Sequence, residues 1–450
     1  MAEKKTNTPV QKRGPQKSAK GSAGRGAAPL PQDRPPSEKE IVQPSVPKAL
    51  EAFLLEIDAL ANTLSLVTPL VRLSADTTWK ALNDFLNSRC KMSNGGKTFT
   101  IPTDEYLDFI NIRRQSQRSR RALQIIPRSF LASLISHYDA FTGSLLRALF
   151  FMKPEVLNSS ERQFSFKDLV SFESISAARE WIVDKEVETL LRESHAEQFK
   201  WMEKKFATPL TKDLPSWPTF VEVTERRNLF VHCNGIVSAQ YLAVCSQNGV
   251  DCSKATVGME LHVTPQYFQD AYATIVEIGL KLAHVLWRRL KPEEMDKADT
   301  SLNNLCLDLI RDEKYAVARN LLDFAAQFNK FGSETIRMIL ILNRAQTYKW
   351  SGHEKRAKGI LAAEDWMAAN EKFQLAAAVL NDDFKTAAKV MKHIGAESSP
   401  SKGDYKEWPM FKVFRTSPEF AATYKEVFGR PFGEVTAEEI SEKKEVKSIQ

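Results

Sequence analysis

Apolar side chains recur every three or four residues along almost the whole chain after Lys48, and this spacing is typical of amphipathic helices. The only stretch that suggests extended backbone is residues 97–102, which follow the helix-breaking Asn94-Gly95-Gly96. Clear examples of the helical spacing are Leu50, Phe53, Leu54, Ile57, Leu60 and Leu64, and later Phe130, Leu134, Phe141, Leu145 and Leu149. The pattern therefore predicts an all-α protein.

Four helices in the middle of the chain can be delimited from this pattern. We expect them at Pro127–Met152, Ser176–Phe206, Phe220–Cys245 and Pro265–Leu290. Pro154 and Pro292 end the first and the last, because proline cannot continue a helix. The first is apolar nearly all round at its C-terminal end, so it should lie at the centre of a bundle or a dimer.

The composition changes after Thr300, where alanine and aromatic positions recur in paired helices. Three predicted second helices align as Ala318-x-x-Leu321-Leu322, Ala357-x-x-Ile360-Leu361 and Ala387-x-x-Val390-Met391. Their spacings of 39 and 30 residues average close to the tetratricopeptide period of about 34. The pattern predicts a short tetratricopeptide-like layer, with an irregular helical bundle as the alternative.

Charge and composition divide the rest of the chain. Residues 1–48 carry +6 of the total net charge of +7 and are rich in proline, so we expect a disordered basic tail. Such a tail can contact nucleic acid or acidic partners, or act only as a solubilising leader. An N-terminal helical segment at 49–124, a central helical domain at 125–295, the repeats at 300–429 and a polar tail at 430–450 complete the expected organisation.

Several classes of protein are disfavoured by missing motifs. The five cysteines form no CxxC pair, and no HExxH, GxSxG or Gly-rich dinucleotide loop occurs, so we expect neither a metal nor a cofactor. Gly96-Lys97-Thr98 lacks the preceding glycine and the following helix of a phosphate-binding loop. No signal peptide is evident, and the nearest apolar run, residues 271–287, is interrupted by charges. We expect a cytoplasmic protein that binds no membrane.

His232 stands apart from the other histidines because of its neighbours. Arg227 and Asn228 precede it, and Asn228 lies one helical turn before it on the same face. The spacing of Leu229, Cys233 and Ile236 suggests that the helix continues beyond His232. Arginine offers a charged fork for phosphate, and histidine titrates near neutrality, so this trio can serve phosphoryl chemistry.

The run ERRNLFVHCNGIVSAQYL, residues 225–242, resembles the motif helix of the HEPN superfamily in its RRN-x-x-x-H-x-NG form. Residues 129–150 resemble that family's first core helix, and residues 166–192 fit the same group, closest to the subset called RiboL-PSP-HEPN. The resemblance covers roughly residues 125–295. It implies a helical bundle whose active members cleave RNA without a metal ion.

In that family two subunits pair so that both motif helices form one composite site. The resemblance implies proton transfer by paired His232 side chains, stabilisation of the phosphorane by paired Arg227 side chains, and orientation of the histidine or phosphate by Asn228. It gives Arg226 a secondary phosphate contact and places Asp139, on the first core helix, facing the motif. The expected protein is a homodimeric endoribonuclease of the toxin type, acting in bacterial stress or anti-phage defence.

Two further expectations concern partners. A basic run without acidic residues between Ile112 and Ser136 can hold an RNA backbone or form a solvated face. It comprises Arg113, Arg114, Arg118, Arg120 and Arg121. The repeat layer can bind a peptide or protein partner, and the alternative for the whole chain is a non-catalytic scaffold in which the HEPN-like domain only dimerises.

Overall fold

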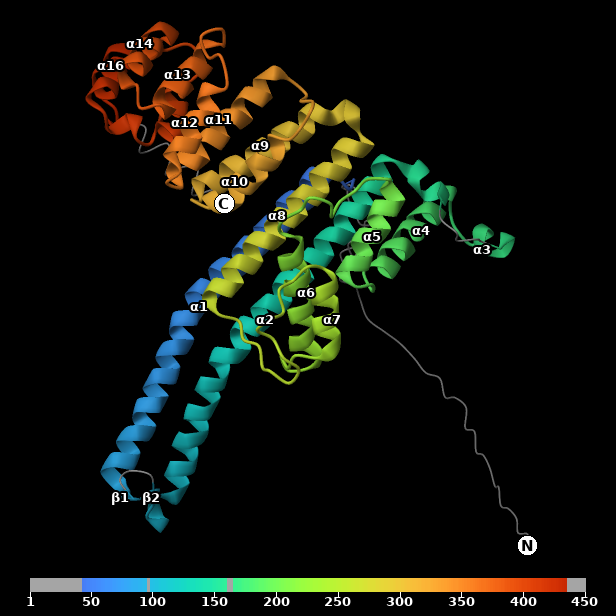
Figure 1. Ribbon diagram of the computed structural model, residues 1–450, viewed down its shortest axis with the longest axis vertical. Coiled ribbons are helices and arrows are strands. Elements are labelled where there is room, and N and C mark those ends of the chain that lie inside the picture. The colour runs from blue at the N-terminus through green and yellow to red at the C-terminus, as the bar shows by residue number, and fades with distance from the viewer. Residues whose placement is uncertain (1–42, 95–97, 160–164, 435–450) are drawn as a thin grey trace, which may run out of the picture. The chain divides into compact units, whose positions relative to one another are not determined.

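The computed structural model describes residues 43–94, 98–159 and 165–434, and Figure 1 shows it as an assembly of helices. The predicted all-α class is confirmed, because the described residues form sixteen α-helices and one short two-stranded ribbon. The ribbon pairs Lys91 with Thr100 and includes part of the predicted extended stretch.

The helices and strands of the N-terminal and central parts have these bounds: α1 Val46–Arg89, β1 Lys91–Ser93, β2 Thr98–Thr100, α2 Tyr106–Met152, α3 Phe166–Val170, α4 Ile175–Leu190, α5 His195–Phe206, α6 Trp217–His232, α7 Ala239–Gln247 and α8 Pro265–Leu290. Short 3₁₀ helices lie at Thr103–Glu105, Pro154–Ser159 and Pro292–Glu294.

The C-terminal part contains α9 Met295–Arg311, α10 Tyr315–Ala325, α11 Glu334–Trp350, α12 Glu354–Ala362, α13 Glu371–Leu380, α14 Phe384–Ile394, α15 Lys402–Glu407 and α16 Pro418–Phe428, with 3₁₀ helices at Pro409–Phe411 and Phe414–Thr416.

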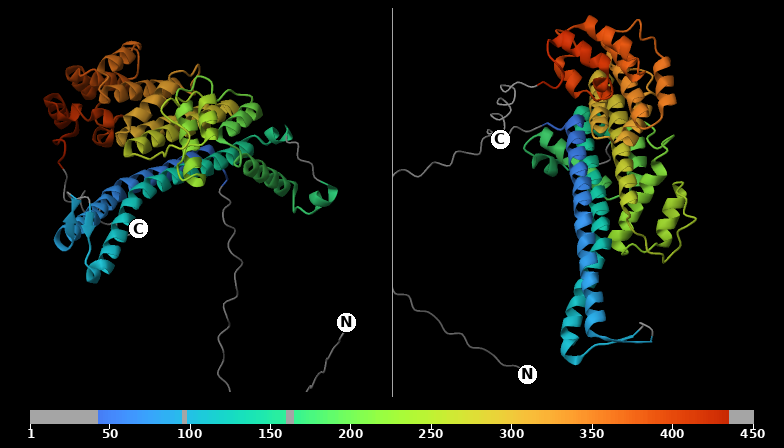
Figure 2. Two further views of the ribbon diagram at one scale, coloured as in Figure 1. Left: turned by 60° about the horizontal axis from the view of Figure 1, so that its bottom comes forward. Right: turned by 90° about the vertical axis from the view of Figure 1, so that its left-hand side faces the viewer.

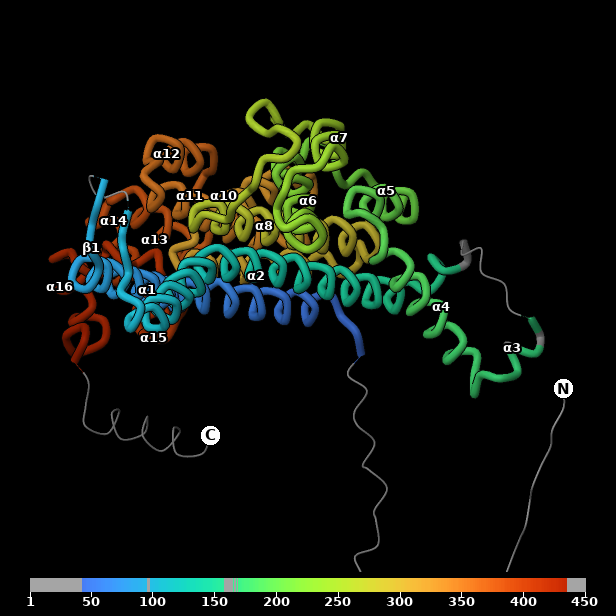
Figure 3. Tube along the Cα trace, turned by 90° about the horizontal axis from the view of Figure 1, so that it is seen from below, coloured from blue at the N-terminus to red at the C-terminus, as the bar shows by residue number. Residues whose placement is uncertain are grey.

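The core of the central part forms where α1, α2 and α8 pack together. Figures 2 and 3 agree in showing α1 and α2 side by side, with α8 against them. A Cβ atom at Gly279 of α8 would lie 2.9 Å from the ring of Phe53, so this glycine allows the close approach of α8 to α1. Phe53 also stacks on Phe141 of α2, with 4.3 Å between the ring centroids.

Two of the predicted helices are wrong because each is interrupted. The predicted helix at 176–206 is α4 and α5, and a turn at residues 191–194 separates them. The predicted helix at 220–245 is α6 and α7, separated by a turn in which Asn234 and Gly235 have positive φ angles of 51° and 81°. Cys233 and Ile236 are therefore exposed and do not continue the apolar stripe.

The central helix is longer than predicted, because α2 passes through Pro127 and the expected domain boundary at residue 124 falls inside it. Proline removes the hydrogen bond to the carbonyl four residues earlier, and that residue, Leu123, is exposed to water. The apolar half of α2 is buried within one chain, from Leu131 to Phe150. The helix therefore lies at the centre of a bundle, which is one of the two expected arrangements, and its composition does not require a second subunit.

The C-terminal helices form three successive pairs, α9 with α10, α11 with α12 and α13 with α14. Ala318, Ala357 and Ala387 are at most 2% exposed at the helix contacts, as their alignment suggested. One hydrophobic core runs from Val46 to Leu340, so it crosses the expected boundary near residue 295 without a break. The tetratricopeptide-like assignment stays a prediction.

The predicted tails lie mostly outside the described residues, at 1–42 and 435–450, while α1 begins at Val46 inside the expected N-terminal tail. The helix α1 is long and apolar enough, by length and composition alone, to cross a membrane. Only 11% of that apolar window is buried. The prediction that residues 271–287 are the nearest candidate is therefore wrong.

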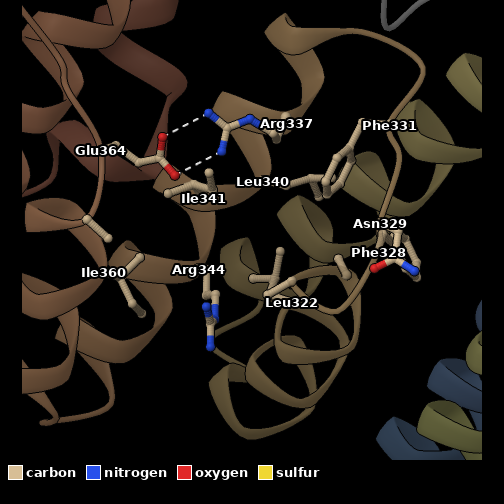
Figure 4. A pocket seen from close by; sticks show the side chains of 13 residues that line it. Leu322, Phe328, Asn329, Phe331, Arg337, Leu340, Ile341, Arg344, Ile360 and Glu364 are labelled. Carbon is tan, nitrogen blue, oxygen red and sulfur yellow. Dashed lines mark hydrogen bonds and ion pairs between the residues drawn. The ribbon is translucent and has the colours of Figure 1, made fainter.

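A cavity of about 360 Å³ lies between α10, α11 and α12 and is drawn in Figure 4. Arg337 donates two hydrogen bonds of 2.8 Å to Glu364 across it, and Arg344 donates to Asp323 at 2.7 Å. Both arginines of this wall are thus paired within the fold, and they join neighbouring helices.

Candidate functional site

A cleft of about 540 Å³ brings together residues of α2, α5, α6 and the start of α7. Arg227, Asn228 and His232 of the predicted trio line it, and so does Asp139 from α2. Figure 3 shows α5, α6 and α7 beside α2. The other residues that line the cleft are Leu191, Arg192, Glu193, Ser194, His195, Gln198, Glu225, Leu229, Cys233, Ser238, Gln240, Tyr241 and Val244.

The position of His232 follows from the way α6 ends. The amides of Cys233 and Gly235 both donate to the carbonyl of Leu229, at 2.8 and 2.9 Å, which closes the last turn. Asn234 and Gly235 supply the left-handed backbone that this turn requires. His232 is consequently the last helical residue and is exposed at the end of the cleft.

Arg227 is held by two neighbours and retains an unused donor. Its Nη1 donates to Asn228 Oδ1 at 3.1 Å, and its Nη2 lies 3.7 Å from Asp139 Oδ2. Arg227 Nε is buried without a hydrogen-bond partner among the described residues. The side chain as a whole is 24% exposed, so the guanidinium can bind an anion such as a phosphate through groups other than the buried Nε.

His195 is a cleft residue that our sequence analysis missed. The Asp139 carboxylate accepts a hydrogen bond from His195 Nε2 at 2.8 Å, and the ring packs against Phe220. The local signal was available in Ser194-x-x-Glu197, which has the pattern of a helix N-terminus, and Ser194 Oγ accepts from the Glu197 amide. Because α5 begins at His195, the imidazole lies at the N-terminus of this helix, where it lines the cleft.

Glu225 is the second cleft residue that we missed. It precedes Asn228 by three residues and His232 by seven, so all three lie on one face of α6. Asn228 Nδ2 donates to Glu225 Oε1 at 3.4 Å. Burial raises the pKa of the Glu225 carboxyl, although His195 and the Asn228 amide lower it in part. The cleft therefore holds a carboxyl group that is suited to carrying a proton.

Arg226 does not line the cleft, and its guanidinium contacts other neighbours. Its Nε donates to Glu222 at 2.6 Å, its Nη1 donates to the His262 carbonyl at 3.1 Å, and its guanidinium lies over the ring of Tyr267. Glu222 also accepts hydrogen bonds from Tyr241 and Tyr267 at 2.7 Å each. These contacts give Arg226 a role in packing, in contrast to its expected phosphate contact.

The five arginines of the basic run lie on α2, all exposed, in the half that pairs with α1. They do not line the cleft. Arg120 stacks over Trp79 of α1, with its guanidinium carbon 3.8 Å from the ring centroid, and Arg121 donates to Gln124 at 2.6 Å. The run is thus a separate basic surface with aromatic neighbours, because Trp79 of α1 lies beneath Arg120 and Phe109 of α2 lies beneath Arg113.

No group of three or more His, Cys, Asp or Glu side chains that could hold a metal ion occurs in the described part of the chain. Comparisons with protein families, curated proteins and solved structures find no match to this chain. The site must therefore be interpreted from its own chemistry: a partly exposed arginine, an exposed histidine, a buried histidine paired with a half-buried aspartate, and a carboxyl group of raised pKa.

Proposed function

We propose that this chain is a metal-independent RNA endonuclease of the HEPN type and that the cleft around Arg227 and His232 is its active site. The observation that carries the proposal is the meeting of Arg227, Asn228, His232 and Asp139 in one cleft. Three of these residues come from the motif helix and the fourth from a helix about ninety positions earlier. Their convergence is what a catalytic site requires and what chance spacing along a helix does not supply.

The proposed reaction is attack of a ribose 2′ oxygen on the adjacent phosphorus. The new P–O2′ bond forms while the P–O5′ bond breaks, the 2′ proton passes to a base, and an acid supplies a proton to O5′. His232 serves in proton transfer, an effect typically worth ~10²–10⁴-fold. Arg227 stabilises the charge that develops on the phosphorane. Asn228 and Asp139 hold the guanidinium in place through the contacts described above.

A second copy of the chain would supply the second imidazole. Apolar side chains next to His232 are exposed and give such a copy a surface to cover: Val231 is 53% exposed, Ile236 39%, Val257 63% and Met259 44%. Backbone hydrogen bonds join Val237 to Met259 and Gly258, so the last three of these residues lie close together. The proposed dimer is therefore supported by this exposed patch and not by the buried apolar half of α2.

The test uses the full chain with total cellular RNA in excess EDTA. We expect cleavage that leaves 2′,3′-cyclic phosphate or 3′-phosphate ends, and we expect His232→Ala and Arg227→Ala to abolish it. His393→Ala is the matched control, since that histidine is 76% exposed and pairs with Glu371 outside the cleft. It should cleave like the wild type.

Two outcomes would refute the proposal. Magnesium-dependent cleavage with 3′-hydroxyl ends would require another mechanism. Absence of cleavage on every RNA would favour the scaffold function, in which Arg227, Asn228 and Asp139 only join α2 to α6. The biological setting, a toxin in bacterial stress or anti-phage defence, rests on the family resemblance alone and remains part of the proposal.

A further inference from the structure

An apolar cavity of about 180 Å³ lies in the C-terminal part, where α9, α11 and α13 meet the segment after α15. Its walls are formed largely by Leu342 and Phe373 from the helices and by Trp408, Pro409 and Met410 from that segment. The volume is that of one large apolar side chain. The charged and catalytic residues described above lie elsewhere.

Gln346 lies among the residues of this cavity with a buried, unpaired amide. Its side chain is 0% exposed, and neither Nε2 nor Oε1 has a hydrogen-bond partner among the described residues. The neighbouring amides differ, because Asn343 Nδ2 donates to Asn303 Oδ1 at 2.8 Å. Leaving a buried amide unpaired costs about 1–3 kcal/mol for each group. The donor and the acceptor of Gln346 could therefore each still form a hydrogen bond with a ligand.

We propose that this cavity binds a peptide segment of a partner protein, with one apolar side chain inserted beside Gln346. The peptide group is the chemistry that fits, because it presents a donor and an acceptor together. On binding, a rotation of the Gln346 side chain would turn its buried amide into the cavity, where the peptide carbonyl would accept from Gln346 Nε2 and a peptide N–H would donate to Gln346 Oε1. Trp408 and Phe373 would contact the inserted side chain, as aromatic anchors do at protein interfaces.

Lys372, at the edge of the cavity, determines which charge is favoured on the peptide residue next to the inserted side chain. Its ammonium lies 4.9 Å from the centroid of the Phe373 ring and forms no ion pair among the described residues. An acidic side chain next to the inserted apolar residue would therefore complement it. The proposal goes beyond the nuclease function and does not depend on it, because none of these residues lines the cleft.

The experiment selects binders from a displayed library of random twelve-residue peptides on the immobilised full chain, with counter-selection on Gln346→Leu. We expect a consensus of one large apolar residue flanked by an acidic residue. In calorimetric titration of a selected peptide, Gln346→Leu and Trp408→Ala should each weaken binding about tenfold or more. Gln327→Leu, which changes an exposed glutamine that does not line the cavity, should leave the affinity unchanged.

Thermal unfolding separates binding from a structural role. Because leucine removes two unpaired buried polar atoms, Gln346→Leu should raise the melting temperature while it weakens binding. The proposal is overturned if no peptide is enriched over the Gln346→Leu chain, or if the selected peptides bind both chains equally. A fall in melting temperature for Gln346→Leu would also overturn it, since Gln346 would then have partners that stabilise the fold.

Discussion

His195 Nε2 lies 2.8 Å from Asp139 Oδ1, although the two residues are 56 positions apart in the chain. The same carboxylate approaches Arg227 through its other oxygen, at 3.7 Å. Asp139 thus connects a buried imidazole to the guanidinium of the motif helix. If the cleft is catalytic, Asp139 acts by positioning these two groups.

We therefore predict that Asp139→Asn lowers kcat for RNA cleavage by about a hundredfold with a small change in KM, because the guanidinium loses its anchor. Single-turnover assays on a defined RNA measure the effect. Asp184→Asn is the control, since that aspartate pairs with Arg147 on an exposed surface. Equal activity of the two variants would show that Asp139 has no part in catalysis.

Removal of the two adjacent arginines should cost very different amounts of stability. Arg226→Ala breaks a nearly buried ion pair and leaves Glu222 uncompensated, so it should lower the free energy of unfolding by about 3 kcal/mol. Arg227→Ala should cost about 1 kcal/mol or less, because it also removes a buried donor without a partner. Urea unfolding measures both values. A larger loss of unfolding free energy for Arg227→Ala would show that this residue mainly stabilises the contact between α2 and α6.

His284 should make the fold sensitive to acid. It is fully buried, neither ring nitrogen is bonded to any residue that the structure describes, and burial together with Arg288 lowers its pKa to about 3. In the unfolded chain it protonates near pH 6.5, so the unfolded state binds an extra proton between about pH 6.5 and pH 3. Its contribution to stability is constant above pH 6.5 and falls below it, by up to about 1.4 kcal/mol per pH unit.

The variant His284→Leu tests this dependence. It should be more stable than the wild type at pH 7, because two unpaired polar atoms leave the core, and it should lose less stability between pH 6.5 and pH 4.5. His353→Leu changes an exposed histidine and should keep the wild-type slope. Parallel pH profiles for wild type and His284→Leu, measured by denaturant unfolding, would contradict the prediction.

The sequence predicted best the elements whose ends carry local signals. The helix α8 occupies residues 265–290 as expected, because Thr264 caps its first turn, Pro265 suits its first position and an amphipathic pattern follows. The breaks after α4 and α6 were missed, because the apolar spacing continues across them while Ser194 and Asn234-Gly235 set the chain direction. At both places the residues that end or begin a helix determined the structure, although the apolar spacing predicted a continuous helix.

The candidate site was also predicted only where the signal is local in the sequence. Arg227, Asn228 and His232 are close in sequence, so helical geometry alone placed them together. The contact between Asp139 and His195 depends on the packing of α5 against α2, and no local pattern encodes it. The expected boundary at residue 124 lies inside α2, because the start of this helix packs on α1 while its end enters the common core.

The apolar patch near His232 should mediate dimerisation. Met259 is 44% exposed and lies on that patch, so Met259→Asp should shift a dimer toward monomer and reduce cleavage together with it. Met367→Asp is the control, because Met367 is 85% exposed in the C-terminal part. Light scattering at micromolar concentration measures the mass. A wild-type monomer with full cleavage activity would remove the dimer from the proposed mechanism.

The junction between α8 and α9 should not tolerate a cut, although the sequence predicts a domain boundary near residue 295. Arg288 of α8 forms an ion pair with Asp299 of α9, whose side chain is 0% exposed. Asn320 of α10 donates to Glu277 of α8 at 2.8 Å, and Lys314 pairs with Asp58 of α1 at 2.9 Å. These contacts make the first C-terminal helices part of the central core.

A chain that ends at Glu293 should therefore aggregate or unfold without cooperativity. It loses the buried side chains of α9 and α10, and each leucine missing from a core costs about 2–5 kcal/mol. A chain that ends at Trp350 keeps every buried residue of the common core up to Leu340 and should retain a cooperative thermal transition. Calorimetry on the two chains makes the comparison. If the shorter chain unfolds as cooperatively as the longer one, the central helices fold alone, and the pairs after α8 are a separate layer after all.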